Sequence, residues 1–233
     1  YNKTYRLKFP EGRDTDTIDI DTGLEKNKKY VIQISSGDSD SKMEFKASKL
    51  QNAVRNKIGS SSPIYDIKLY GKCKSKIFKK KRTYRITSEY DNDLIKHLNK
   101  TLDNEKYLNL KEVNIILTDI LMTLVYLHGN NYAHRDIKLE NIMVNYGEDG
   151  RIKEAVLIDY GFLIKIPHVV TTYRNNKQYE ERYINDGKRI GTPEYMAPQI
   201  KERGRYNQKC DIYSLGVVMS KLYNYSTFYE TRN

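Results

Sequence analysis

The chain is poor in the residues that mark several broad protein classes. Its 233 residues include two cysteines, five prolines and no tryptophan. Cys73 and Cys210 lie far apart and lack the spacing of a metal site, so neither a disulfide framework nor a zinc cluster is indicated. We therefore expect an intracellular, reducing compartment, most simply the cytoplasm. The absence of tryptophan beside 21 tyrosines is a compositional bias from which no function follows.

Long apolar runs are also missing. No run approaches the roughly 20 residues that span a bilayer, which argues against a transmembrane segment. The chain opens at Tyr1 without a methionine, a basic leader or an apolar signal core, so we expect a fragment excised from a longer protein. With 38% hydrophobic and 30% charged residues, the composition is that of a globular protein with one large domain or two small lobes.

The net charge of +11 is unevenly distributed. The stretch from Lys68 to Arg82 holds eight basic residues and no acid, whereas Glu11 to Asp21 holds five acids and one arginine. We interpret the basic stretch first as the solvated rim of a hairpin. Its alternative is a docking patch for an acidic protein, an anionic lipid or, least favoured, nucleic acid.

The first 90 residues have the pattern of strands with one helix. β-Branched runs predict strands at about 30–34, 64–71 and 81–90. Residues 44–58 carry apolar side chains at helical spacing, and Gly59 with the residues after it would end that helix.

From Leu94 onward the pattern becomes helical. Residues 110–129 form a long amphipathic pattern that ends at Gly129, and a further apolar helix begins near Asp211. The apolar positions of the long helix are Val113, Ile116, Leu117, Ile120, Leu121, Leu124, Val125 and Leu127.

Two segments follow the long helix. Residues 141–161 have the pattern of two short strands joined by a Gly-Glu-Asp-Gly turn, which would bring Asn141 and Asp159 close together. Residues 162–189 are polar and show no clear period, so we expect a long loop there.

The stretch "HRDIKLEN", residues 134–141, concentrates polar chemistry in one turn. Asn141 and the hairpin carboxylate of Asp159 are oxygen ligands of the kind that Mg²⁺ takes together with phosphate oxygens. Asp136 is a separate carboxylate that can accept a proton from an attacking hydroxyl, and Lys138 can balance the charge of a moving phosphoryl group. A loop that merely caps secondary structure would explain each residue alone, but not the combination.

These motifs resemble those of the eukaryotic protein kinase family. "HRDIKLEN" is similar to its catalytic loop, "DYG" at 159–161 to its metal-binding triplet, and "GTPEYMAP" at 191–198 to the end of its activation segment. "DIYSLG" is similar to the start of its central C-lobe helix. Lys138 with Thr192 resembles the serine/threonine branch.

The resemblance implies roles for individual residues. Asp136 would orient or deprotonate the substrate hydroxyl, and Lys138 would contact the γ-phosphate of ATP. Asn141 and Asp159 would hold Mg²⁺. The supporting positions that it implies are His134, Arg135, Tyr160, Gly161, Thr192 and Asp211.

The resemblance also implies a regulated activation segment and an adenine site. Arg135 would meet a phosphate on that segment, for which the candidate acceptors are Thr171, Thr172, Tyr173, Tyr179 and Tyr183. Ser88, Glu89 and Tyr90 would form the gatekeeper and hinge. Asp93 would reach the ribose or, as an alternative, cap a helix.

The N-terminal part departs from the family pattern. A glycine-rich loop is not apparent, since the matching region offers only Gly12 and Gly23 with carboxylates between them. Gln33 aligns with the strand lysine that contacts the α- and β-phosphates, unless a shifted register brings Lys28 or Lys29 into that place.

Further departures concern the partner of that lysine and the end of the chain. Glu44 is the only acid in the candidate helix, whereas spacing favours Gln51 or Asn52 as the helix partner. Gln199 replaces a family glutamate, and the sequence stops at Asn233, so we expect a minimal or truncated C-lobe. Gln33 is either native or an engineered substitution.

We therefore predict an α+β, bilobal fold like that of protein kinases, with a divergent, strand-rich N-lobe at 1–90 and a helical C-lobe at 91–233. The predicted function is that of a serine/threonine protein kinase that uses ATP and Mg²⁺ on a protein substrate. The alternative is a pseudokinase that acts as a binding or scaffolding module. A nucleic-acid-binding domain is the remaining, least favoured hypothesis.

Overall fold

The computed structural model describes residues 3–7, 29–36, 49, 67–74, 81–103, 107–175 and 177–225. These residues belong to two units, with the division between Tyr90 and Asp91, and each unit is described by itself. Apart from Lys49, the expected helix at 44–58 lies outside the described residues, and so do the acidic stretch at 11–21 and the glycines Gly12 and Gly23.

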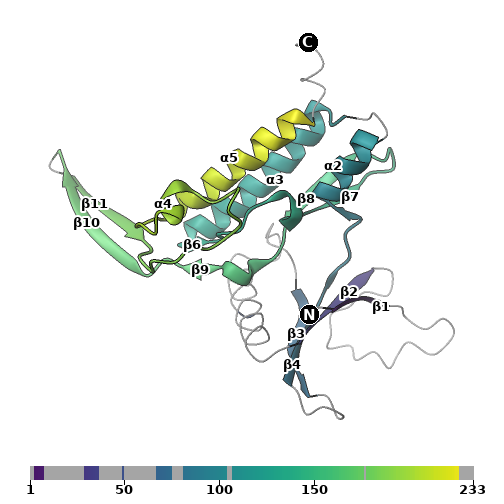
Figure 1. Cartoon of the computed structure of the whole chain (residues 1–233), viewed down its shortest axis with the longest axis horizontal. Helices are drawn as coiled ribbons and strands as arrows, with labels where there is room; N and C mark the ends of the chain where they lie inside the picture. The colour runs from purple at the N-terminus through teal and green to yellow at the C-terminus, as the bar shows by residue number, and fades with distance from the viewer. Residues whose placement is uncertain are drawn as a thin grey trace. The chain divides into compact units, whose positions relative to one another are not determined.

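The first unit contains a four-stranded antiparallel sheet (Figure 1). Its order is β1 (Lys3–Leu7), β2 (Tyr30–Ser36), β4 (Lys81–Ser88), β3 (Ile67–Lys74). The three strands predicted from β-branched runs are confirmed as β2, β3 and β4, because such side chains fit the pleated, half-buried surface of a sheet.

The register of β2 places Gln33 within the sheet. Strand β2 pairs with β4 over seven consecutive residues, from Tyr30 opposite Ser88 to the far end, without a bulge. Gln33 lies at the centre of this ladder, opposite Arg85. Lys29 directly precedes β2, and its carbonyl accepts a hydrogen bond from the Glu89 amide at 2.9 Å. The alternative alignment that would give Lys28 or Lys29 the place of Gln33 stays a prediction.

The second unit is built around two long helices, α3 (Leu110–Gly129) and α5 (Lys209–Asn224), which lie side by side (Figure 1). The shorter helices are α2 (Leu94–Asp103) and α4 (Pro198–Lys201), with 3₁₀ turns at Leu139–Asn141 and Tyr160–Phe162. Strands β5 (Asn92–Asp93), β7 (Ile142–Tyr146) and β8 (Ile152–Leu157) form one sheet; β6 (Tyr132–Ala133) pairs with β9 (Ile164–Lys165). No helix in the described part of the chain is long and apolar enough to cross a membrane.

Helix α3 begins and ends where its sequence predicts. Asn109 caps it by accepting from the Glu112 amide at 2.9 Å, while the Glu112 carboxylate accepts from the Asn109 amide, which is a capping box. The prediction that the whole apolar face of α3 is buried is wrong at two positions. Leu121 and Val125 are exposed, and the exposed fraction of Val125 is 62%. At 100° per residue these two positions lie away from the stripe that is buried. That stripe consists of Ile116, Ile120, Leu124 and Leu127.

The hairpin predicted at 141–161 is confirmed as β7 and β8. Its turn is closed by the Gly147 amide, which donates to the Arg151 carbonyl at 2.8 Å, and Gly150 has a φ of 72° that favours glycine. The Ile158 amide donates to the Asn141 carbonyl at 2.8 Å. Asp159 thus directly follows a residue bonded to Asn141, so the hairpin brings the two candidate metal ligands to one end of the sheet.

The prediction of a long loop at 162–189 is wrong, because the segment contains two strands. Strands β10 (His168–Arg174) and β11 (Lys177–Tyr183) form an antiparallel hairpin that projects from one end of the second unit (Figure 1). Valine, threonine and tyrosine at 169–173 favour a strand, and Asn175 has a φ of 49° in the short connection. A pair of asparagines between two such runs is the turn signal that would have predicted the hairpin.

Candidate active site

The loop that follows α3 is held by a single buried carboxylate at the start of α5. Asp211 is fully buried, and its Oδ1 accepts from the Arg135 amide at 2.8 Å while its Oδ2 accepts from the His134 amide at 2.9 Å. Nε2 of His128, at the end of α3, lies 2.9 Å from the same Oδ2. Two helices and the loop backbone therefore meet on one side chain, and buried donors that would otherwise be unsatisfied are paired.

His134 lies behind the loop as a neutral, buried ring. Burial lowers its pKa, although three nearby carboxylates act in the opposite direction. Its Nδ1 lies 3.3 Å from the Asp136 amide and its Nε2 lies 3.2 Å from the Ile158 carbonyl, so the ring accepts at Nδ1 and donates at Nε2. The ring also meets Tyr160 edge to face with centroids 4.9 Å apart. This packing ties the loop to the 159–161 triplet.

The carboxylate of Asp136 is the convergence point of the site. Its Oδ1 accepts from the Thr192 amide at 3.0 Å and from the Thr192 hydroxyl at 2.8 Å. Its Oδ2 accepts from Asn141 Nδ2 at 3.0 Å and lies 3.0 Å from Lys138 Nζ. Lys138 Nζ also donates to the Thr192 hydroxyl at 2.9 Å. The structure thus brings together four residues that the sequence analysis selected, and they form one connected network.

Asn141 and Asp159 present the oxygen atoms that a divalent cation requires. Asn141 uses its amide nitrogen twice, toward Asp136 Oδ2 and toward the Asp136 carbonyl at 2.8 Å. This leaves Oδ1, which accepts no hydrogen bond from any described residue. Asp159 is exposed, and one of its oxygens accepts from the Gly161 amide at 3.2 Å. Two oxygen ligands of this type fit Mg²⁺, which takes its remaining ligands from water and phosphate.

The backbone of the site has a positive φ at three positions. Asp159 and Arg135 have φ values of 60° and 73°, which are uncommon for residues other than glycine. Gly191 has a φ of 104°, and a Cβ at this position would collide with the Arg135 carbonyl oxygen. Glycine therefore lets the chain before Thr192 approach the loop closely enough for Thr192 to reach Asp136.

The guanidinium of Arg135 has partners that sequence reasoning missed. Nε donates to the Phe162 carbonyl at 2.8 Å, and Nη1 donates to the Tyr206 hydroxyl at 3.0 Å and lies 3.5 Å from Asp186 Oδ2. The family resemblance implies a phosphate on the activation segment at this place. An Asp-Gly turn at 186–187 was the available signal, but nothing in the sequence indicated that it would face Arg135.

The remaining predicted residues are placed as follows. Gln33, Glu89 and Tyr90 belong to the first unit. Asp93 accepts from the Lys96 amide at 2.8 Å and pairs with Lys96 Nζ at 2.6 Å, so it caps α2, as its alternative interpretation stated. The residues proposed as phosphate acceptors lie on β10 and β11.

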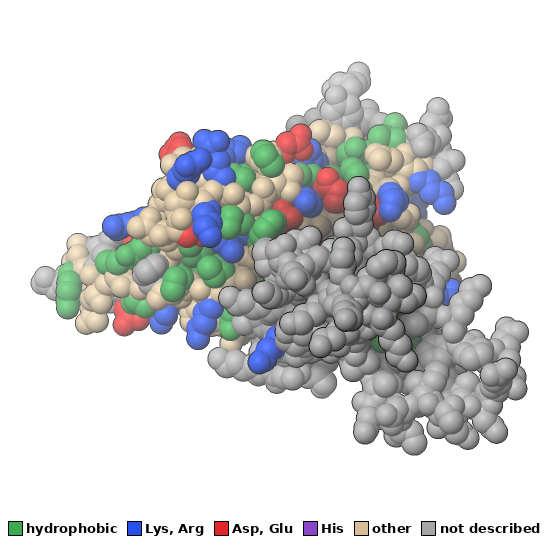
Figure 2. Space-filling model, turned by 60° about the horizontal axis from the view of Figure 1, so that its bottom comes forward, with side chains coloured by type: hydrophobic (Ala, Val, Ile, Leu, Met, Phe, Trp, Pro, Cys, Tyr) green, Lys and Arg blue, Asp and Glu red, His purple; other side chains and the backbone are tan. Residues whose placement is uncertain are grey.

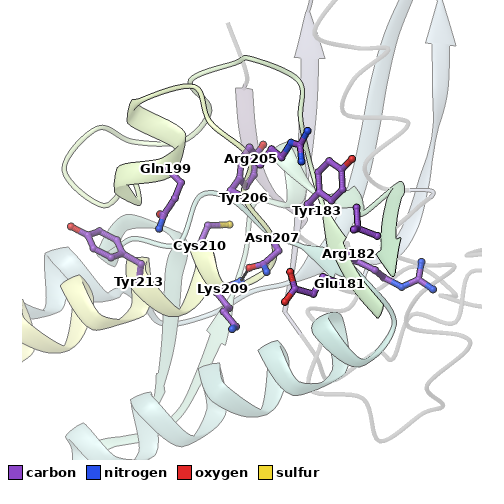
Figure 3. Close-up of a pocket in the computed structure, with 11 residues that line it drawn as sticks. Glu181, Arg182, Tyr183, Gln199, Arg205, Tyr206, Asn207, Lys209, Cys210 and Tyr213 are labelled. Carbon is purple, nitrogen blue, oxygen red and sulfur yellow. Dashed lines mark hydrogen bonds between the residues drawn. The ribbon is translucent and has the colours of Figure 1, made fainter. Parts of the chain in front are cut away.

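A pocket of about 630 Å³ lies beside the network, between β11 and the segment that leads into α5 (Figure 3). Arg205 stacks over the Tyr183 ring, 5.0 Å from its centroid. Cys210 also lines the pocket, and burial raises the pKa of its thiol. Tyr206 belongs both to the pocket wall and to the partners of Arg135, so the pocket adjoins the site through this residue.

Basic side chains on the described surface are interspersed with acidic and apolar ones in the view of Figure 2. The basic stretch at 68–82 falls on β3, β4 and the connection between them, where the structure describes the strand backbone. Its interpretation as a rim or as a docking patch stays a prediction.

Comparison with known proteins agrees with this site. A family model of the protein kinase domain matches residues 31–233, and the chain therefore belongs to the protein kinase family. The expected α+β kinase fold is thereby confirmed.

The similar proteins include serine/threonine kinases from protists. The chain is 40% identical over 114 residues to the serine/threonine-protein kinase pakG of Dictyostelium discoideum, covering 48% of this chain and 8% of that protein. It is 34% identical over 131 residues to pakH of the same organism, covering 56% and 21%. A third relative is the calcium-dependent protein kinase 5 of Plasmodium falciparum, with 39% identity over 105 residues, 45% of this chain and 15% of that protein. The matched stretches span about a fifth or less of the length of each of these three relatives.

Proposed function

We propose that the chain transfers the γ-phosphoryl group of ATP to a serine or threonine hydroxyl of a protein substrate, with Asp136 as the catalytic base. The observation that carries the proposal is the hydrogen bond of 2.8 Å from the Thr192 hydroxyl to Asp136 Oδ1. The carboxylate accepts from an aliphatic alcohol in this structure, and a substrate hydroxyl has the same chemistry. A base within hydrogen-bond reach of the proton that it accepts meets the geometric requirement for general base catalysis.

Lys138 supplies the positive charge next to this base. Its ammonium lies 3.0 Å from Asp136 Oδ2 and is about one-fifth exposed. A partly exposed ammonium can exchange its contact with the carboxylate for one with a phosphate oxygen. Lys138 would thus stabilise the charge of the transferred group, which is the main contribution that a protein makes to phosphoryl transfer.

Asn141 and Asp159 would hold the magnesium ion that accompanies ATP. Asn141 would coordinate through Oδ1, since its amide nitrogen is engaged by Asp136. The described residues contain no group of three or more His, Cys, Asp or Glu side chains able to hold a metal on their own. Phosphate oxygens and water would supply the remaining ligands of the ion. When bound, the ion neutralises phosphate charge.

The proposal assigns residues 1–90 to the N-lobe and residues 91–233 to the C-lobe of one kinase domain. Gln33, Glu89 and Tyr90 would contact the nucleotide from the N-lobe. A second candidate depends on the uncharged side chain of Gln33: a pseudokinase in which the C-lobe network is complete but nucleotide binding is weak. Glutamine carries no charge to offset the α- and β-phosphates.

Transfer of labelled phosphate from Mg-ATP to a mixed protein substrate tests the proposal. We expect transfer by the unmodified chain, and Asp136→Asn should lower the rate by about 10³-fold or more, since an amide cannot take the proton. Glu202→Gln is the matched control, because Glu202 is an exposed acid outside the network and its neutralisation should leave the rate unchanged.

Gln33→Lys separates the two candidates. If the unmodified chain transfers phosphate and Asp136→Asn abolishes this transfer, the kinase is supported. Transfer by Gln33→Lys alone would support a pseudokinase with a competent C-lobe. If neither chain transfers phosphate and Mg-ATP does not raise the melting temperature of either, the proposed enzyme is refuted.

A further inference from the structure

Arg135 joins two ends of the segment that contains the β10–β11 hairpin. Its side chain is only 7% exposed. The carbonyl that accepts from Nε belongs to Phe162, before the hairpin, and the carboxylate near Nη1 belongs to Asp186, after it. One guanidinium therefore ties together the start and the end of an excursion of more than 20 residues. A buried arginine needs such partners, because an unpaired charge in the interior is costly.

Asp186 is held in position for this contact by its own backbone. One carboxylate oxygen accepts from the Lys188 amide at 3.1 Å, and the other faces Arg135. Gly187 between them has a φ of 62°, a conformation that glycine adopts without strain. The Asp-Gly-Lys turn is thus a local structure that fixes a carboxylate, in the way that aspartate side chains commonly close turns.

Tyr206 fixes the same region from the other side. Its backbone forms two hydrogen bonds with Ile184, of 2.7 and 3.2 Å, and its hydroxyl accepts from Arg135. The tyrosine is buried, and it packs in a hydrophobic cluster with Ile184, Ile166 and Ala133. Because Ile166 lies before the hairpin and Ile184 after it, this cluster closes the base of the hairpin without any charged group added by modification.

We propose that Asp186 and Tyr206 are positioning residues that act through Arg135, with the Asp186 carboxylate supplying permanently the negative charge that a phosphate on the activation segment would otherwise bring. A phosphorylated hydroxyl would offer Arg135 a charge of about −1.5 to −2, and phosphorylation orders segments by this kind of pairing. Here the Phe162 carbonyl, the Asp186 carboxylate and the Tyr206 hydroxyl already accept from Nε and Nη1 of a guanidinium that is largely enclosed. The segment is therefore ordered in the unmodified chain.

The connection to the chemistry runs through one residue. The Arg135 amide is bonded to Asp211, and the next residue in the chain is Asp136. A guanidinium anchored at both ends of the segment holds the left-handed backbone of Arg135, and thereby the direction in which Asp136 leaves the loop. This inference rests on the proposed kinase function for its activity measurement, and a second measurement below does not depend on catalysis.

The test compares the unmodified chain, treated with a broad phosphatase, with Asp186→Asn, Asp186→Glu and Tyr206→Phe. Phosphatase treatment should leave kcat of the unmodified chain unchanged within about twofold. Asp186→Asn should lower kcat about tenfold with an unchanged KM for ATP, and Asp186→Glu should restore part of the loss because it keeps the charge. Glu202→Gln, an exposed acid away from Arg135, is the matched control and should have no effect.

Hydrogen exchange provides the readout independent of catalysis. Amide protection over residues 184–192 should fall in Asp186→Asn and in Tyr206→Phe, with residues 110–129 unaffected. Full protection in both variants would overturn the inference, and so would a loss of activity on phosphatase treatment. If the unmodified chain transfers no phosphate, the proposed function fails; hydrogen exchange then still decides whether Asp186 orders the segment.

Discussion

Asp211→Ala offers the sharpest test of how the catalytic loop is held. The substitution removes an acceptor from the amides of His134 and Arg135 and from the ring of His128. Each hydrogen bond to a charged group contributes about 1.5–3 kcal/mol, so the three together amount to roughly 4–9 kcal/mol. Release of the strained Arg135 backbone returns about 1–3 kcal/mol. The expected net loss in the free energy of unfolding is therefore about 1–8 kcal/mol, with a central value of about 4–5 kcal/mol.

Such a loss is a large part of the stability of a domain, which is typically about 5–15 kcal/mol. Urea denaturation followed by circular dichroism measures it, and tyrosine fluorescence is a second probe because the chain contains no tryptophan. With a slope of about 2 kcal/mol per molar urea, the central value of this loss lowers the urea midpoint by roughly 2–2.5 M.

Two further variants separate the acceptor role from other effects. Asp211→Asn keeps one acceptor oxygen but turns an amide nitrogen toward at least one backbone donor. Its free energy of unfolding should therefore fall by an intermediate amount, about 2–4 kcal/mol. Glu202→Ala, at an exposed position, should change the free energy by less than about 0.5 kcal/mol. A loss below about 1 kcal/mol in Asp211→Ala would refute the reasoning, since buried amides without partners cannot be that inexpensive.

The remaining predictions concern a glycine and a histidine. Gly191→Ala should lower both the free energy of unfolding and the rate of phosphate transfer, because the added Cβ would collide with the Arg135 carbonyl and displace Thr192 from Asp136. Equal transfer rates for this variant and the unmodified chain would contradict this prediction. Burial lowers the pKa of His97 below its usual value of about 6.5, so below that pH the unfolded chain binds a proton that the folded chain does not, and stability should fall as the pH falls. His97→Phe should flatten the dependence of the urea midpoint between about pH 7.5 and 5.5, whereas an unchanged slope would show that other groups cause it.

Much of the candidate site was readable from local pattern. The spacing within 134–141 and the turn between β7 and β8 depend on short-range geometry, and both placed Asn141 and Asp159 correctly near one another. Helix α3 was predictable because its capping box and its terminal glycine are local signals. The exposure of Leu121 and Val125 was not predictable, because an amphipathic pattern does not specify which neighbouring elements will cover the edges of the apolar stripe.

The tertiary structure decided the partners of the charged groups. Which carboxylate meets Arg135 depends on the return of the chain after the β10–β11 hairpin, 51 residues away, and no local propensity encodes that approach. The same holds for Asp211, which reaches the loop from 76 and 77 residues away. Local patterns thus predicted the chemical inventory of a protein kinase and most of its helices and strands, but not the β10–β11 hairpin. Only the fold determined which of these residues contact one another, because long-range contacts arise from packing the whole core rather than from neighbours along the chain.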